Sequence, residues 1–204
     1  LSLSKVTDLT IVAQWPRLVH LHCSMTKVAD LKPLQGANNL EQLYLSGCPV
    51  LSLEHIGKLS KLGNLDLSST QITDLSPLEG LIHLHSLNLS STQCTTDLQA
   101  IASLEGLLTL NLAYTSVSDL EALGRLPKLQ NLDLSYTDVV DLSALANWKS
   151  TLNQLSLAGT SVEDFSVLSS FDRLENLDLS ETCTDDWTFL STMVQLKELN
   201  LEST

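Results

Sequence analysis

Residues 62–81 read LGNLDLSSTQITDLSPLEGL, and this stretch decides the fold of the chain. It opens with the pattern LxxLxL, which occurs nine times at steps of 22 residues, or of 23 residues in two places. The opening leucines are Leu18, Leu40, Leu62, Leu84, Leu107, Leu129, Leu152, Leu174 and Leu196. A fixed period of about 20 to 30 residues is the signature of a solenoid, in which each repeat forms one coil. The sequence therefore predicts a stack of similar coils.

Each repeat begins as a short strand and continues as a tight helical turn. Strand alternation places Leu65 on one face and its neighbours Asn64 and Asp66 on the other. Later in the same repeat, Leu75 and Leu78 recur at the three-residue spacing of a 3₁₀-like turn. Stacking the coils buries these leucines, at about 1.5–3 kcal/mol for each side chain. We predict a right-handed α/β solenoid, with a parallel β-sheet on the concave face and short 3₁₀ or α turns on the convex face.

Two polar columns accompany the leucines. Eight residues after each opening leucine stands one polar residue: Thr26, Cys48, Thr70, Thr92, Thr115, Thr137, Thr160, Thr182 and Thr204. Aspartates precede the helical turns at Asp8, Asp30, Asp74, Asp97, Asp119, Asp141, Asp164 and Asp186. We interpret the aspartates as helix caps rather than calcium ligands, because calcium needs several oxygens converging on one ion.

These patterns resemble a known family. LENLDLSETCTDDW at residues 174–187, like its siblings, is similar to leucine-rich repeats of the short 22-residue subclass typified by internalins and by the protein phosphatase 1 regulatory subunit. The resemblance implies the solenoid fold. In that subclass the polar column is normally Asn, which forms a ladder of hydrogen bonds to the neighbouring backbone. Here we expect the threonines to do this work, at about 1 kcal/mol for each bond.

We expect one leucine-rich-repeat domain over residues 1–204. It would consist of a partial coil at 1–17 and nine coils that start at 18, 40, 62, 84, 107, 129, 152, 174 and 196. The chain begins inside a repeat, which suggests a fragment of a longer protein. Neither end has a polar capping repeat, so core leucines would be exposed there and end-to-end contacts would be possible. The two single-residue insertions, near Thr95-Thr96 and near Trp148–Thr151, read as loop changes.

Composition narrows the classes of partner. The net charge is −13, which argues against nucleic acids and anionic membranes and favours a partner with a basic surface. No apolar run is long enough to span a membrane. Trp15, Trp148 and Trp187 occupy leucine positions, so we interpret them as core fillers or end plugs.

The repeat also places the four cysteines. Cys23 and Cys94 take buried positions, Cys48 replaces a column threonine, and Cys183 lies in a loop. Cys23 and Cys48 fall on neighbouring coils but three residues out of step, about 10 Å along a strand, so a disulfide is not expected. Free thiols favour a cytoplasmic location, with an extracellular or surface-anchored protein as the alternative.

The residues that vary between repeats are the candidates for function. The concave face should present four columns, equivalent to residues 64, 66, 68 and 69 of the quoted repeat, and these 36 positions hold every tyrosine but neither Lys nor Arg. Tyr114 and Tyr136 occupy the same position in adjacent coils, so their rings should lie about 5 Å apart. Exposed aromatic residues are enriched at interface hot spots. We predict that a partner contacts Tyr44, Asp66, Asn88, Asn111, Tyr114, Asp133, Tyr136, Asp178 and Glu181.

Several functions stay open at this point. We find no nucleophile with a base, no metal cluster and no phosphate loop, so we expect neither an enzyme nor a cofactor. His20 and His22 point the same way but lack a third metal ligand beyond Tyr44. The leading hypothesis is a non-enzymatic module that binds a protein on its concave face, and the net charge favours a partner with a basic surface. The alternatives are a regulatory subunit of an enzyme such as a phosphatase, the recognition arm of a larger multidomain protein, and an extracellular adhesin or receptor fragment.

Overall fold

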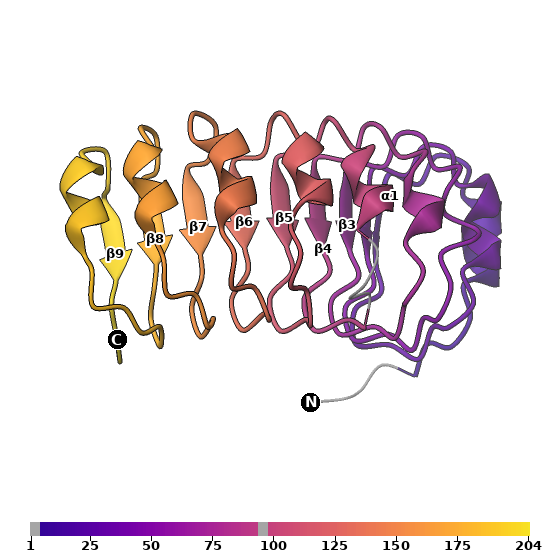
Figure 1. Cartoon of the computed structure of the whole chain (residues 1–204). Helices are drawn as coiled ribbons and strands as arrows, with labels where there is room; N and C mark the ends of the chain where they lie inside the picture. Colours follow the sequence, from indigo (N-terminus) through magenta and orange to yellow (C-terminus); the bar gives the residue numbers. More distant parts are fainter. Residues whose placement is uncertain (1–4, 94–97) are drawn as a thin grey trace.

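The computed structural model describes residues 5–93 and 98–204, which wind into a curved stack of coils (Figure 1). In this described part, nine strands form one parallel sheet in sequence order, and each strand pairs with the next without a register shift. The strands are β1 (His20–His22), β2 (Gln42–Tyr44), β3 (Asn64–Asp66), β4 (Ser86–Asn88), β5 (Thr109–Asn111), β6 (Asn131–Asp133), β7 (Gln154–Ser156), β8 (Asn176–Asp178) and β9 (Glu198–Asn200). The predicted parallel sheet is therefore confirmed.

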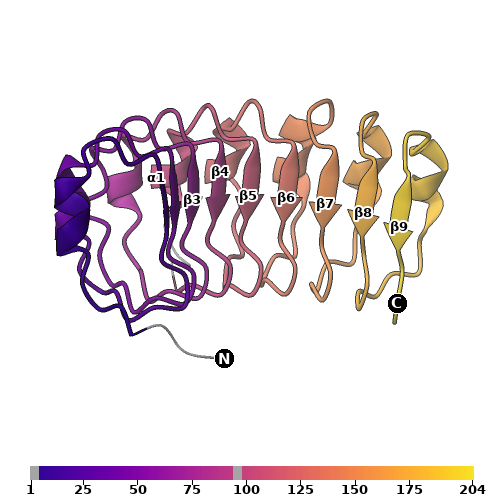
Figure 2. The same cartoon turned by 180° about the vertical axis from the view of Figure 1, so that it is seen from behind.

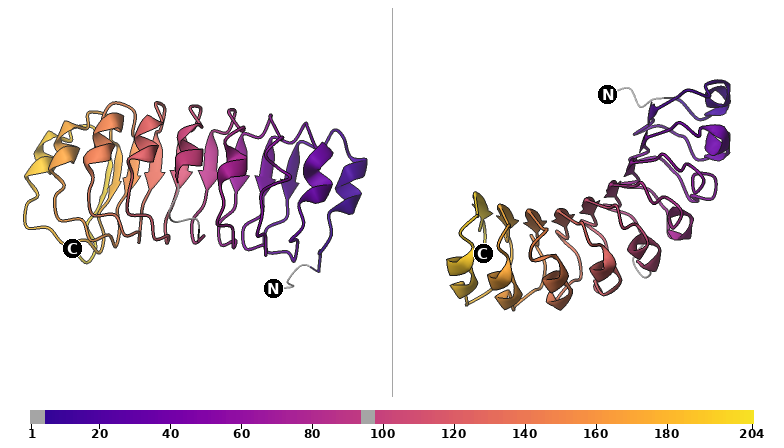
Figure 3. Two further views of the ribbon diagram at one scale, coloured as in Figure 1. Left: turned by 45° about the vertical axis from the view of Figure 1, so that its right-hand side comes forward. Right: turned by 90° about the horizontal axis from the view of Figure 1, so that it is seen from above.

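Short helices lie on the opposite side of the stack. Figure 2 shows the sheet from the other side, with the helices behind it, and the end-on view in Figure 3 shows the strands on the inside of the arc. The 3₁₀ helices are η1 (Thr10–Gln14), η2 (Lys32–Gly36), η3 (Ser76–Leu78), η4 (Ala122–Arg125), η5 (Ser143–Trp148), η6 (Ser166–Ser170) and η7 (Thr188–Thr192), and α1 (Gln99–Ala102) is an α-helix. The solenoid has the predicted concave sheet and convex helical turns. None of the helices in the described part has the length and apolar content needed to cross a membrane.

The core is a continuous column of leucines. Leu65, Leu87, Leu110 and Leu132 from the centres of successive strands are at most 3% exposed. Each lies next to its equivalent in the following coil, because the strands pair in register. Burial of the same position in the inner coils, from Leu43 to Leu177, explains why the 22-residue period is kept so closely.

The column aspartates hydrogen-bond to the start of the helical turns, but Asp74 and Asp164 lie one residue before the N-cap, so their predicted place at the N-cap was wrong. In seven coils a carboxylate oxygen of the column aspartate accepts the backbone N–H two residues later, as Asp74 does from Ser76 at 2.9 Å and Asp164 from Ser166 at 2.8 Å. Hydrogen bonding to the side chain and then to the backbone of Ser76 and Ser166 lowers the pKa of Asp74 and Asp164 below the ordinary value for a carboxyl group. The eighth residue of the column, Asp97, lies outside the described residues.

The threonine column is built differently from our expectation. Seven of the threonine hydroxyls donate to the carbonyl oxygen three residues earlier in their own coil, as Thr115 does to Leu112 at 2.6 Å and Thr137 to Leu134 at 2.7 Å. The predicted ladder between coils was therefore wrong for these seven threonines. The physical reason is length, since a hydroxyl one bond from Cβ is too short to span the spacing of about 4.8 Å between coils. Column residues bridge coils where Cys48 replaces threonine: its Sγ donates to the carbonyl oxygen of Cys23 at 3.1 Å and lies 3.4 Å from the hydroxyl of Thr26.

Three further predictions concern large side chains and insertions. Trp148 is fully buried, and its indole N–H donates to the carbonyl oxygen of Leu126 at 2.8 Å, as expected of a core filler. Trp187 is half-buried. Trp15 is 48% exposed and follows η1 in the first described coil, which has a neighbour on one side only, so of the two predicted roles it fits the end plug and not the core filler. The insertion near Trp148 follows the six-residue helix η5, whereas Thr95-Thr96 and Cys94 lie outside the described residues.

Candidate protein-binding face

The concave face is hollowed over its C-terminal half. A groove of about 500 Å³ runs across β5 to β9, and its walls are polar side chains that point outward from these strands. They include Asn111, Asn131, Asp133, Asn176, Asp178 and Glu198. The predicted residues Asn111, Asp133 and Asp178 thus lie in one groove. Tyr44, Asp66 and Asn88 lie on β2, β3 and β4 of the N-terminal half, outside the groove.

A second feature runs along the ends of the strands. In each of the nine coils of the described chain, one residue has a positive φ, between 54° and 66°. It lies three positions after the last residue of the strand, as Ser69 does after Asp66. These residues are Met25, Gly47, Ser69, Ser91, Tyr114, Tyr136, Gly159, Glu181 and Ser203, and we call them the rim row. In this left-handed region glycine is strain-free, whereas other residues carry about 1–2 kcal/mol of backbone strain. Seven of the nine rim residues are not glycine.

The two rim tyrosines stack on each other. The ring centroids of Tyr114 and Tyr136 are 4.6 Å apart and their planes differ by 10°, which confirms the predicted spacing. Tyr114 is 60% exposed, while Tyr136 is half-buried. Two large aromatic residues, stacked on each other, therefore occupy positions whose backbone conformation favours glycine.

Tyr136 reaches across one whole coil. Its hydroxyl donates to Oε1 of Glu181 at 2.8 Å, 45 residues along the chain. The coil between them carries Gly159, and a Cβ there would stand 2.5 Å from two carbon atoms of the Tyr136 ring. The hydrogen bond to Glu181, with the negative charge around it, raises the pKa of Tyr136 to about 12. Tyr114, Tyr136 and Glu181 consequently form one connected unit on the rim.

The outward Asp and Asn residues of the strands also build the rim. In β3, Oδ1 of Asp66 accepts the backbone N–H of Ser68 at 2.9 Å, and in β6, Oδ1 of Asp133 accepts that of Ser135 at 3.0 Å. Asn88, Asn111, Asp178 and Asn200 make the same contact in their coils. Side chains that accept the N–H two residues on favour a turn. These predicted contact residues therefore also position the rim row.

One predicted column of the concave face does not face a partner. Ser68, Ala113, Ser135 and Ala158 are all less than one-tenth exposed. The prediction that this column points outward was wrong for these coils, because the chain already turns towards the left-handed rim residue and the side chains pack between coils. Ser68 and Ser135 instead hydrogen-bond to Ser46 and Ser156 of adjacent coils.

The N-terminal part of the face has a smaller aromatic pair. His22 and Tyr44 stack with ring centroids 4.4 Å apart. Met25 of the rim row is 61% exposed, and its sulfur lies 2.5 Å from where a Cβ of Gly47 would be, so it lies across that glycine. Over the described residues there is no group of three or more His, Cys, Asp or Glu side chains placed to hold a metal ion.

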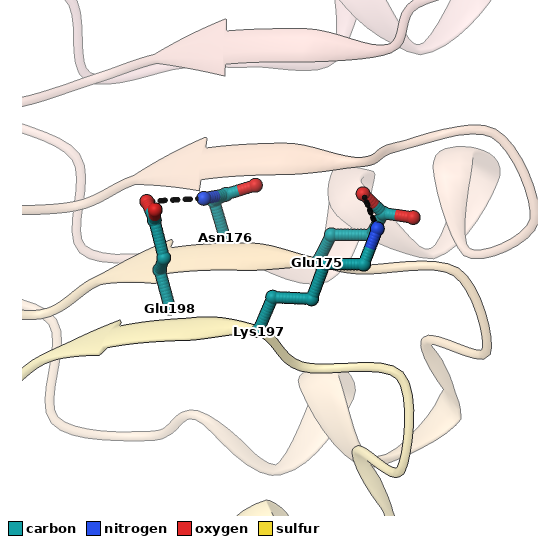
Figure 4. Close-up of polar contacts among 4 residues, drawn as sticks. All are labelled: Glu175, Asn176, Lys197 and Glu198. Atoms are coloured by element: carbon teal, nitrogen blue, oxygen red, sulfur yellow. Dashed lines mark hydrogen bonds and ion pairs between the residues drawn. The ribbon is translucent and has the colours of Figure 1, made fainter.

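The described strands of the concave face carry acidic side chains but neither Lys nor Arg. Asp66, Asp133, Asp178 and Glu198 project from the strands, and Glu198 accepts a hydrogen bond from Asn176 (Figure 4). No strand residue or rim residue in the described chain is Lys or Arg. Lys197 stands just before β9, where its Nζ pairs with Glu175 at 2.8 Å (Figure 4). The groove therefore offers hydrogen-bond acceptors and negative charge to a partner.

Three thiols fall within the described part of the chain, and all three are free. Cys23 and Cys48 are buried and Cys183 is exposed. Burial raises the pKa of the Cys23 thiol, and the nearby Cys48 raises it further. Cys48 Sγ lies 3.1 Å from the backbone carbonyl oxygen of Cys23, so the two residues are closer than the separation of about 10 Å that the count along the strands implied.

Sequence comparison with known protein families finds leucine-rich repeats in part of the chain. A family model described as Leucine Rich repeats (2 copies) matches residues 60–103. A comparison with curated protein sequences gives no match.

Solved structures with the same fold cover nearly all of the chain. An internalin (InlF) from Listeria monocytogenes str. 4b F2365 superposes with a TM-score of 0.90 and 26% sequence identity, over 97% of this chain and 58% of the internalin. Internalin C2 from the same organism gives a TM-score of 0.71 and 28% identity, over 98% of this chain and 77% of the other. The plant peptide hormone receptor RGFR1, in complex with RGF2, superposes with a TM-score of 0.71 and 19% sequence identity, over 91% of this chain and 32% of the receptor. At this identity the likeness shows the fold alone. This chain spans little more than half of the InlF structure.

Proposed function

We propose that this leucine-rich-repeat solenoid is a non-enzymatic interaction module that binds a protein partner on its concave face. The contact would centre on the Tyr114–Tyr136 pair at the rim and extend into the groove over β5 to β9. Asn111, Asp133 and Asp178 would supply polar contacts within the groove. The likeness to internalins supports the fold of such a module.

The observation that carries the proposal is the tyrosine pair on a left-handed backbone. Stacking contributes only about 0.5–1.5 kcal/mol beyond burial of the rings, which at best offsets the backbone strain of a non-glycine residue. Glycine serves the same scaffold position at Gly47 and Gly159. Folding alone therefore does not call for two aromatic rings there, and Tyr114 is 60% exposed. Rigid, exposed aromatic side chains suit interface hot spots.

The partner's surface should be positively charged where it meets this face. The chain carries a net charge of −13, and the outward residues of the described strands include acidic side chains but neither Lys nor Arg. Charge complementarity of this kind speeds encounter and weakens as salt is added. The cytoplasm is the proposed location, on the evidence of the buried free thiols Cys23 and Cys48.

Site-specific photo-crosslinking tests the binding face. A photoreactive amino acid replaces Gln154, an exposed residue of β7 on the concave face, and in a matched protein it replaces Gln35, an exposed glutamine in η2 on the convex face. Both proteins are irradiated in extract of the organism that encodes the chain, and cross-linked proteins are identified by mass spectrometry. We expect a specific protein adduct from position 154 and none from position 35. Adducts from position 35 alone would reject the concave face as the binding surface.

A further inference from the structure

The rim row has a low stretch between two large side chains. Ser69 and Ser91 are exposed, and we call these two residues the serine shelf. On one side Met25 lies across Gly47, and on the other stands Tyr114. At about 4.8 Å for each coil, the shelf occupies a gap of about 14 Å along the row.

The wall on the Tyr114 side is an open aromatic face. Tyr136 covers the face of Tyr114 that points towards the C-terminal coils, at a centroid distance of 4.6 Å. Tyr114 nevertheless stays 60% exposed, and its neighbour on the other side is only Ser91. A flat group above Ser91 would therefore continue the existing stack of rings.

Negative charge and acceptor oxygens border the shelf. Asp66 lies three residues before Ser69, and its carboxylate is turned towards the rim because Oδ1 accepts both the N–H and the hydroxyl of Ser68. Asn88 is held in the same way by the N–H of Ser90. None of the described rim or strand residues is Lys or Arg, which would compete for these acceptors.

We propose that the serine shelf binds an arginine side chain of the partner, with its guanidinium over Ser91 and stacked on Tyr114. The shelf hydroxyls and the carboxylate of Asp66 accept its N–H groups. A guanidinium is flat, stacks on aromatic faces and presents several donors at once, whereas a lysine ammonium is a compact point charge that does not stack. The inference rests on the proposed function, because it names one group that the binding face recognises.

A phage-displayed library of random dodecapeptides provides the probe. It is selected on the immobilised wild-type protein, and the recovered peptides are then measured against three variants. Ser91→Tyr covers the shelf with a ring, and it should fold because Tyr114 and Tyr136 already adopt the same backbone conformation. Ser203→Tyr makes the same change at the same backbone conformation in the last coil. Asp66→Asn removes the charge but keeps the turn, as Asn88 and Asn111 do in their coils.

The expected result is enrichment of arginine over lysine among the selected peptides. Their binding should fall at least tenfold with Ser91→Tyr, fall less with Asp66→Asn, and stay unchanged with Ser203→Tyr. Peptides without arginine enrichment, or equal binding to Ser91→Tyr and wild type, would overturn the proposal. The proposed function still stands in that case if Tyr114→Ser with Tyr136→Ser abolishes binding. If that double variant also binds normally, or no peptide is selected, both proposals fail.

Discussion

The phenol of Tyr136 donates a hydrogen bond of 2.8 Å to Oε1 of Glu181, although the two residues lie two coils apart. The contact is possible because the residue between them is Gly159, whose missing side chain leaves room for the ring. A repeat that is uniform in its core thus carries a locally specific arrangement on its rim. Four consecutive rim residues, from Tyr114 to Glu181, cooperate in it.

The first prediction concerns the ionisation of Tyr136. Its pKa of about 12 depends first on the hydrogen bond to Glu181, so Glu181→Ser should lower it towards the ordinary value for tyrosine. Serine occupies the same left-handed position at Ser69 and Ser91, so the backbone should be kept. Ultraviolet absorbance of the phenolate during a pH titration measures the change. Glu79→Ser, an exposed change on the convex side, is the control and should leave the titration as it is.

The same contact predicts a dependence of stability on pH. The pKa of Tyr136 is raised on folding, so its contribution is fully present below the unfolded pKa of about 10 and is lost as the pH rises to about 12. The difference in melting temperature between wild type and Glu181→Ser should therefore be constant at neutral pH and shrink across this alkaline window. A difference that persists unchanged through the window would contradict the assigned contact.

A third prediction tests the space above Gly159. Gly159→Ser should displace the ring of Tyr136, because any Cβ there would stand 2.5 Å from the ring carbons. The pKa of Tyr136 should fall as it does with Glu181→Ser, and the protein should lose about 1 kcal/mol through the strained backbone. Gly36→Ser, where nothing lies within 4 Å, is the matched control. Titration and chemical denaturation together measure both effects, and an unchanged titration in Gly159→Ser would show that the ring does not lie over this glycine.

Tyr114 should contribute little to the free energy of unfolding. Tyr114→Gly removes one stacking contact of about 0.5–1.5 kcal/mol but relieves a similar backbone strain, so the free energy of unfolding should change by less than about 1 kcal/mol. Leu110→Ala, four residues earlier in the core of the same coil, should cost about 2–5 kcal/mol. Denaturant unfolding compares the two. A large loss from Tyr114→Gly would assign the tyrosine to the scaffold instead of the binding face.

The threonine column should behave as a set of independent bonds. Thr115→Val and Thr137→Val each remove a hydrogen bond to a carbonyl oxygen of the same coil, at about 1 kcal/mol apiece. Because neither bond reaches the next coil, the double variant should lose the sum of the two within about 0.5 kcal/mol. Unfolding free energies of the two single variants and the double variant test this. Strong coupling between the two positions would restore the ladder that the structure does not show.

The sequence predicted the scaffold because the scaffold is repeated. Leu65 and Leu110 sit at equivalent positions in their repeats, and such positions stay in register through the sheet, so the period alone placed them in the core. The same register predicted the stack of Tyr114 on Tyr136. The two outward strand columns were placed correctly for the same reason.

What the sequence did not predict depends on backbone conformation between the regular elements. The left-handed rim was missed, although Gly47 and Gly159 in that column were a signal for a positive φ. Because the left-handed turn was not predicted, Ser68 and Ser135 were assigned to the surface, whereas the turn buries their side chains. The hydrogen bond from Tyr136 to Glu181 could not be foreseen from neighbouring coils, because it skips one coil.

The most direct test of the claim that the rim tyrosines are the centre of the binding face is the affinity of the cross-linked partner for a variant that lacks both tyrosines. Titration calorimetry compares wild type with Tyr114→Ser and Tyr136→Ser combined, and with Val140→Ser, which removes an apolar side chain of equal 60% exposure outside the concave face. A hot spot predicts that the dissociation constant rises about 30-fold or more for the tyrosine variant and stays constant for Val140→Ser. Equal affinity of the tyrosine variant and wild type, with both proteins folded, would contradict the assignment of this rim as the partner-binding centre.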